Sequence, residues 1–225
     1  MANALIFRRY FAERVKIITD SLLVSLYGSN FTNTPNTTLL VGSDGTTTYA
    51  TPNNFAYTTS SGSDENGGIK FDGVNDYLVT NSIAITDEFS WEIICKSSTA
   101  ADMFVLDHRS ADVGIQPMYL TSLGSLQFYS TTDIKDSNTD AGIFKFDGKY
   151  HQIVVTIDNT NIKTYYDGTL VKTTAGNISA YTACSLTIGS RHSFTACFNG
   201  TVKNVRTYEK ALTLEEIQQN YNASI

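Results

Sequence analysis

The sequence predicts an all-β protein, an antiparallel sandwich of two sheets with a short C-terminal helix and an N-terminal arm. The composition favours strands, because 13 Tyr and 12 Phe occur with abundant Thr but only 3 Pro. Short β-rich segments follow one another after residue 68, separated by Gly, Asn and Asp rather than by helical patterns. At 225 residues the chain can bury a core large enough for one such domain.

The expected strands come from runs of β-branched and aromatic residues bounded by turn residues. Alternation is clearest at residues 152–157, where Ile153, Val155 and Ile157 face one side. Asp167-Gly168 between two β-rich runs indicates a tight hairpin. From residue 28 to 68 we expect long loops with edge strands. The expected strands are residues 21–27, 39–41, 55–57, 69–71, 77–79, 89–95, 103–106, 118–120, 126–129, 150–157, 162–166, 169–173, 185–188 and 200–208.

A helix is predicted after Thr213. This threonine can cap the first turn, and Glu216, three residues later, completes a capping box. Leu214, Ile217 and Tyr221 supply an apolar stripe, so we expect the helix to pack on the sandwich.

The first twenty residues differ from the rest of the chain. Leu5, Phe7, Phe11, Val15 and Ile18 recur at roughly helical spacing. Two interpretations stay open, an amphipathic helix or a first strand with its lead-in. We therefore divide the chain into an arm or anchoring segment, residues 1–20, and a sandwich domain, residues 21–225.

Charge excludes a nucleic-acid partner. The formal net charge is −6, and the main basic concentration is Arg8, Arg9, Arg14 and Lys16. Binding to phosphates needs a basic face, which this composition does not supply.

No segment resembles a membrane span or a secretory signal. No run approaches the eighteen or so apolar residues of a transmembrane helix, so membrane insertion is not expected. Charged residues interrupt any apolar stretch in the first twenty residues, which predicts synthesis in the cytosol. There, Cys95, Cys184 and Cys197 are expected as free thiols, with a Cys184–Cys197 bridge as the alternative.

Five segments in order resemble the laminin-G-like domains of the concanavalin A superfamily. The resemblance implies a jelly-roll sandwich, and Tyr150 stands where those domains usually have Trp. The segments are residues 69–78 (IKFDGVNDYL), 89–93 (FSWEI), 147–155 (DGKYHQIVV), 166–171 (YDGTLV) and 198–217.

The resemblance does not extend to a catalytic site. Glycanases of this superfamily carry Glu-x-Asp-x-x-Glu on one strand, and this spacing does not occur on any expected strand. Glu92 stands alone beside Trp91, and the three histidines have no metal-ligand spacing. We predict that the protein is not an enzyme.

No cofactor is expected, and calcium is the weaker hypothesis. Asp72 and Asp76 are the candidate ligands, although aspartates in this pattern more often form turns. Lys203 and Asn204 stand where the resembling domains commonly have an acidic ligand, which argues against the site.

Candidate glycan-binding residues are polar pairs in expected loops and aromatic side chains on which a sugar can stack. They are His108, Arg109, Tyr129, Tyr181, Arg191 and His192.

We therefore predict a non-enzymatic binding or adhesion module on a bacteriophage virion, as a head-fibre, decoration or tail-associated protein that binds host-surface carbohydrate. On this hypothesis the chain is made in the host cytoplasm and docks on other virion proteins through its arm. Alternatives are a purely structural decoration or assembly protein, with a homo-oligomeric interface, and an extracellular lectin or glycanase domain secreted by a bacterium. The expected anchoring residues are Phe7, Arg8, Arg9, Tyr10 and Phe11.

Overall fold

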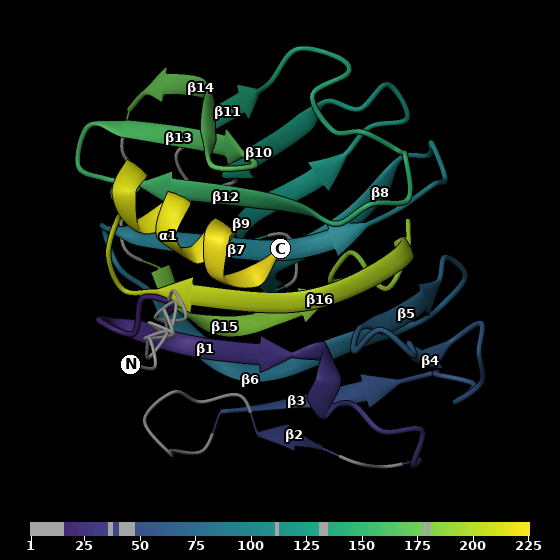
Figure 1. The fold of residues 1–225 in the computed structure, drawn as a ribbon. Helices are drawn as coiled ribbons and strands as arrows, with labels where there is room; N and C mark the ends of the chain where they lie inside the picture. Colours follow the sequence, from purple (N-terminus) through teal and green to yellow (C-terminus); the bar gives the residue numbers. More distant parts are fainter. Residues whose placement is uncertain are drawn as a thin grey trace, which may run out of the picture.

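Two antiparallel sheets packed face to face form the body of the protein (Figure 1). The computed structural model describes residues 16–35, 38–40, 48–110, 113–130, 135–176, 178 and 181–225. In these ranges each sheet has eight strands. The predicted all-β jelly-roll sandwich is confirmed.

Sheet A has the strand order β14-β13-β12-β7-β16-β5-β4, and β1 also pairs with β16, beyond the end of β5. Its strands are β1 (Leu22–Tyr27), β4 (Gly62–Ser63), β5 (Ile69–Asp72), β7 (Phe89–Lys96), β12 (His151–Ile157), β13 (Asn161–Tyr166), β14 (Thr169–Ala175) and β16 (Asn199–Tyr208).

Sheet B has the strand order β11-β10-β9-β8-β15-β6-β3-β2. Its strands are β2 (Leu39–Leu40), β3 (Tyr49–Asn53), β6 (Tyr77–Ile85), β8 (Met103–Ser110), β9 (Val113–Leu120), β10 (Leu126–Ser130), β11 (Lys135–Asn138) and β15 (Tyr181–Ile188).

The structure differs from the predicted elements in a few segments. Strands β3 and β4 lie in the region where we expected long loops with edge strands, whereas strand β11 and the 3-10 helix η1 (Gly28–Asn30) were not predicted. Residues 55–57 are a loop, not a strand. Phe31, Phe55 and Tyr57 form an aromatic cluster with ring centroids 5.1 to 6.3 Å apart. Aromatic residues buried from a loop give the same local hydrophobic signal as a strand, which explains the wrong prediction.

The core between the sheets is built around Trp91. Its ring contacts Phe89 and Phe128, and all three side chains are buried. The indole Nε1–H donates to Nδ1 of His108 over 3.2 Å, and Nε2 of His108 lies 3.0 Å from the carbonyl of Cys184. Since a buried indole N–H needs an acceptor, His108 serves as that acceptor inside the core.

Helix α1 (Leu214–Ser224) lies across the outer face of sheet A, in front of β12, β7 and β16 (Figure 1). The predicted capping box is confirmed, because Thr213 accepts from the Glu216 amide and Glu216 accepts from the Thr213 amide. Ile217 packs against Val154 and Tyr165 of the sheet in a second apolar cluster.

A polar network centred on Glu92 is enclosed between α1 and sheet A. The carboxylate has no exposed surface and lies 3.3 Å from Nη1 of Arg206. Gln152 donates to it over 2.7 Å and Asn220, from α1, over 2.8 Å. The hydroxyl of Tyr208 completes the group at 3.4 Å. The buried ion pair therefore joins β7 to β16, and α1 is bonded to it through Asn220 and Ser224.

Residues 16–20 of the expected arm pack against α1. Ile17 and Ile18 contact the second apolar cluster, and the Ile18 amide donates to Asn220 over 2.8 Å. The side chain of Gln219 donates to the Lys16 carbonyl over 2.7 Å. The anchoring candidates Phe7, Arg8, Arg9, Tyr10 and Phe11 lie outside the described residues, so the division at residue 20 stays a prediction.

All three cysteines are free and buried, which confirms the expected thiols over a Cys184–Cys197 bridge. Burial raises the pKa of Cys95 above its usual range and that of Cys184 to about 11, so both stay protonated at neutral pH. Across the described residues, no helix has the length and apolar character needed to cross a bilayer.

Candidate functional site

A groove on the outer face of sheet B is the candidate site. It has a volume of about 570 Å³, within the size range of small-molecule sites. Strands β3 and β6 form its floor, and the loop from β15 to β16 forms one wall. Its principal lining residues are Tyr49, Thr51, Asn53, Tyr77, Val79 and Phe194.

Aromatic rings in the groove are exposed rather than buried. Phe194 stacks on Tyr77 with ring centroids 4.2 Å apart and an interplanar angle of 19°. Phe194 is 49% exposed and Tyr49 is 43% exposed. Phe194 also has a φ of 60°, a backbone region that bulky residues rarely adopt. Strained backbone of this kind is concentrated at binding sites, which is consistent with a loop shaped to present a ring.

Asp107 holds that loop against the sheet. This carboxylate is fully buried on β8 and accepts from Nε and Nη2 of Arg109, over 2.7 and 2.9 Å. Its Oδ2 also accepts from the His192 amide over 2.7 Å and lies 3.1 Å from the His192 ring. The Asp107 carboxylate therefore links Arg109 of β8 to His192 of the loop.

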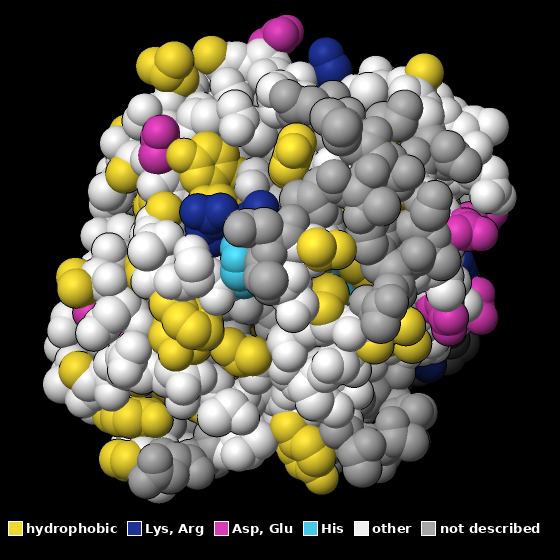
Figure 2. Space-filling model, turned by 180° about the vertical axis from the view of Figure 1, so that it is seen from behind, with side chains coloured by type: hydrophobic (Ala, Val, Ile, Leu, Met, Phe, Trp, Pro, Cys, Tyr) yellow, Lys and Arg dark blue, Asp and Glu magenta, His cyan; other side chains and the backbone are white. Residues whose placement is uncertain are grey.

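The Asp107 cluster and the groove share one face of the sheet. Asp107 pairs with Thr187, Thr187 with Val79, and Val79 with Thr51, so this row crosses four strands. Directly paired residues point to the same face. Figure 2 shows this face, with basic and histidine side chains side by side near its middle, next to hydrophobic ones, and acidic side chains toward the edges.

Gly114 on β9 makes room for Arg109. A Cβ at this position would lie 2.6 Å from the His108 carbonyl oxygen and 3.2 Å from Cγ of Arg109, and the φ of Gly114 is 129°. Only glycine adopts that backbone readily, so the start of β9 depends on it.

The structure corrects the predicted loop at His108 and Arg109. Both residues lie within β8, and their exposed fractions are 0% and 6%. Burial lowers the pKa of His108 to about 4, so the ring is neutral at pH 7. Its Nδ1 can therefore accept the hydrogen bond from the Trp91 N–H. A ligand on the surface cannot reach His108. Arg109 faces the opposite side from His108 and is bonded to Asp107, which also accepts from the His192 amide.

The remaining candidates are spread across sheet B. Arg191 and His192 lie in the loop between β15 and β16, as predicted. Tyr129 is a half-buried residue of β10, four strands away from β6 in the sheet order. Tyr181 begins β15, and its side chain lies outside the described residues. The structure thus brings Arg191 and His192 near the groove but leaves Tyr129 distant.

Asp72 and Asp76 shape the turn between β5 and β6. One oxygen of Asp72 accepts from the amides of Val74 and Asn75, over 2.7 and 3.2 Å. Asp76 is fully buried and accepts from the Asp72 amide over 2.9 Å. Burial raises the pKa of Asp76 to about 6. Both aspartates accept turn hydrogen bonds, and the described residues include no cluster of three His, Cys, Asp or Glu side chains suited to a metal.

The raised pKa of Asp76 predicts a pH-dependent stability. The folded state binds this proton more tightly than the unfolded chain, whose value is near 3.8. The stabilisation is complete below that value and is lost as the pH rises through about 6. We expect Asp76→Asn to remove this dependence. Urea unfolding at pH 4 to 7 should show wild type losing stability relative to the variant, and parallel curves would contradict the prediction.

The fold and groove define a jelly-roll sandwich domain with a ligand-sized aromatic site on one outer face. The chain belongs to the concanavalin A-like lectin/glucanases superfamily, whose sequence profile matches residues 71–218. No curated protein matches it by sequence.

Solved structures with the same fold include binding domains of botulinum neurotoxins. The domain of neurotoxin DC in complex with SialylT is 15% identical with a TM-score of 0.64, and covers 92% of this chain and 52% of its own. The same domain in complex with rat synaptotagmin II is 16% identical with a TM-score of 0.64. The match covers 91% of this chain and 52% of the neurotoxin domain. This chain therefore spans about half the length of those structures, and the likeness concerns the fold.

Proposed function

We propose that the protein is a non-catalytic binding module that takes a glycan in the groove on sheet B. The observation that carries this proposal is the exposed stack of Phe194 on Tyr77, beside hydroxyl and amide side chains such as Thr51 and Asn53. A sugar ring presents apolar C–H faces to aromatic rings and hydroxyls to polar neighbours, which is the combination found here.

The buried carboxylates support a binding role over a catalytic one. Glycoside hydrolysis uses two carboxyl groups that flank the scissile bond. Glu92 is enclosed under α1 with Arg206, and Asp107 is enclosed by Arg109. Both have an exposed fraction of 0%, so neither is placed to act on a substrate.

Ligands of proteins with this fold motivate a glycan as the first probe. One similar neurotoxin domain is in complex with SialylT, and cell entry of neurotoxin type C depends on interaction with two ganglioside molecules. At 14 to 15% identity these are properties of those proteins, and the groove residues carry the argument for this chain.

Phe194→Ala tests the proposal. We expect wild type to bind members of a neutral glycan array and the variant to lose about tenfold in affinity, because one stacking face is removed. Leu123→Ala, which removes an exposed side chain of the β9–β10 turn, is the matched control and should bind normally. Equal binding by wild type and Phe194→Ala would refute the groove as the glycan site.

The proposed setting is the surface of a bacteriophage particle, with residues 1–15 docked on other virion proteins, since residues 16–20 pack against α1. The composition, rich in Ser, Thr and Asn, supports this setting. Light scattering of the full chain against a chain starting at Lys16 tests the docking role. Assembly by the full chain alone would support it, and two identical monomers would contradict it.

A further inference from the structure

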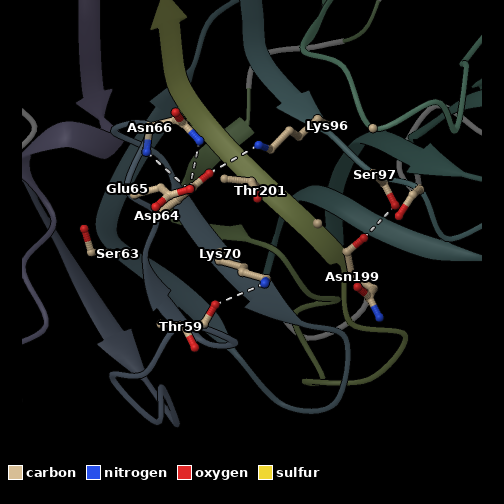
Figure 3. Close-up of a pocket in the computed structure, with 13 residues that line it drawn as sticks. Thr59, Ser63, Asp64, Glu65, Asn66, Lys70, Lys96, Ser97, Asn199 and Thr201 are labelled. Atoms are coloured by element: carbon tan, nitrogen blue, oxygen red, sulfur yellow. Dashed lines mark hydrogen bonds and ion pairs between the residues drawn. The ribbon is translucent and has the colours of Figure 1, made fainter.

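We propose that a hollow on the outer face of sheet A is a second binding site, for a sugar that carries an anionic group. The hollow has a volume of about 480 Å³ and lies at the ends of β4, β5 and β7 and the start of β16. This second site is separate from the groove of sheet B. Its central residues are Lys70, Lys96, Thr201, Ser97 and Asn199 (Figure 3).

Strand register places two ammonium groups on either side of one hydroxyl. Thr201 pairs with Lys70 on β5 and with Lys96 on β7. With adjacent strands about 4.8 Å apart, the two lysine Cα atoms lie roughly 10 Å apart, with Thr201 between them. Figure 3 shows Lys70 and Lys96 on opposite sides of Thr201. A carboxylate or sulfate above Thr201 is within reach of both side chains.

Both ammonium groups are held in position by the protein. Nζ of Lys96 lies 3.3 Å from Asp64 and 4.7 Å from the centre of the Tyr150 ring. Nζ of Lys70 donates to the Thr59 carbonyl over 3.0 Å. Each ammonium has three N–H donors, so donors remain for a ligand after these contacts. Part of the entropy cost of ordering the lysines is met before a ligand binds.

The carboxylate nearest the hollow is already engaged. Asp64 accepts from the amide and side chain of Asn66, over 3.3 and 3.5 Å, and from the Tyr150 hydroxyl over 3.4 Å. Together with the Lys96 ion pair, these donors hold the pKa of Asp64 below its usual range, although burial acts in the opposite direction. Asp64 therefore positions Lys96, and its negative charge offsets part of the positive charge of that lysine.

Hydroxyl and amide groups around the lysines favour a sugar over a simple ion. Thr59, Ser63, Ser98 and Asn66 add to the central residues, and every lining residue except Gly148 and Gly200 has a polar or charged side chain. Such a lining can hydrogen-bond sugar hydroxyls while the two lysines select the anionic substituent.

The test compares lactose, 3′-sialyllactose and 3′-sulfolactose by calorimetry on the full chain, because these sugars share one core. We expect at least one anionic sugar to bind about tenfold more tightly than lactose. Lys70→Gln and Lys96→Gln should each abolish most of that difference. The preferred anionic sugar identifies carboxylate or sulfate as the recognised group. Glu65→Gln, which removes a negative charge from the lining, should tighten anionic binding.

Lys172→Gln on β14 is the matched control, since it removes the same charge away from the hollow. Phe194→Ala should leave the affinity for the preferred anionic sugar unchanged, which separates this site from the groove. The proposal is overturned if neither anionic sugar binds at millimolar concentration, if lactose binds equally well, or if the Lys70 and Lys96 variants retain the preference with wild-type stability.

Discussion

Replacing Glu92 with alanine is expected to lower the free energy of unfolding by about 3–5 kcal/mol. The change leaves Arg206 charged at an exposed fraction of 1%, without the carboxylate 3.3 Å away. It also removes one acceptor of Gln152 and one of Asn220, a residue that bonds α1 to the sheet. Urea unfolding measures the loss, and hydrogen exchange in α1 should increase with it.

A double variant separates loss of the ion pair from loss of packing. Glu92→Leu combined with Arg206→Met removes both charges and keeps apolar volume, so it should be less destabilised than Glu92→Ala. Glu209→Ala, at an exposed residue, is the control and should change stability by less than about 0.5 kcal/mol. A Glu92→Ala protein as stable as this control would contradict the assigned role.

Asp107→Ala is expected to weaken both folding and glycan binding. The stability loss should be about 3–5 kcal/mol, because Arg109 remains charged and buried without its bidentate partner. Binding in the groove should fall by at least tenfold, because the His192 amide loses the acceptor that seats the loop of Phe194. Unfolding curves and titration with the glycan that wild type binds measure the two effects.

His192→Ala distinguishes loop positioning from general destabilisation. It keeps the backbone bond to Asp107 and the Arg109 pair but removes the ring contact of 3.1 Å. We expect a stability loss of about 1 kcal/mol with a measurable loss of binding. If Asp107→Ala binds glycan like wild type at a temperature where both are folded, Asp107 does not position the site.

Local sequence patterns were sufficient for the elements that make up the fold. Alternation at Ile153, Val155 and Ile157 predicted a buried strand, and all three face the core. Thr213 and Glu216 predicted the helix start and its capping box. These signals are local, because strand period and helix capping involve residues only two to four positions apart.

The length of β8 decided which of its side chains reach the surface, and the sequence signal for the end of this strand was weak. Ending the strand at residue 106 made His108 and Arg109 look like one polar loop pair, whereas β8 continues to Ser110. Alternation then points His108 into the core and places Asp107 and Arg109 on the outer face of sheet B. The alternating polar residues Asp107 and Arg109 were the signal that could have revealed the cluster.

The sequence by itself determined the all-β class, most of the strands, the capped helix and the free thiols. Only the tertiary structure decided the sites, because loop packing brings Phe194 onto Tyr77 and strand pairing places Lys70 and Lys96 on either side of Thr201. Register between such segments is set by burial of a whole sheet face, a collective property that no local pattern contains.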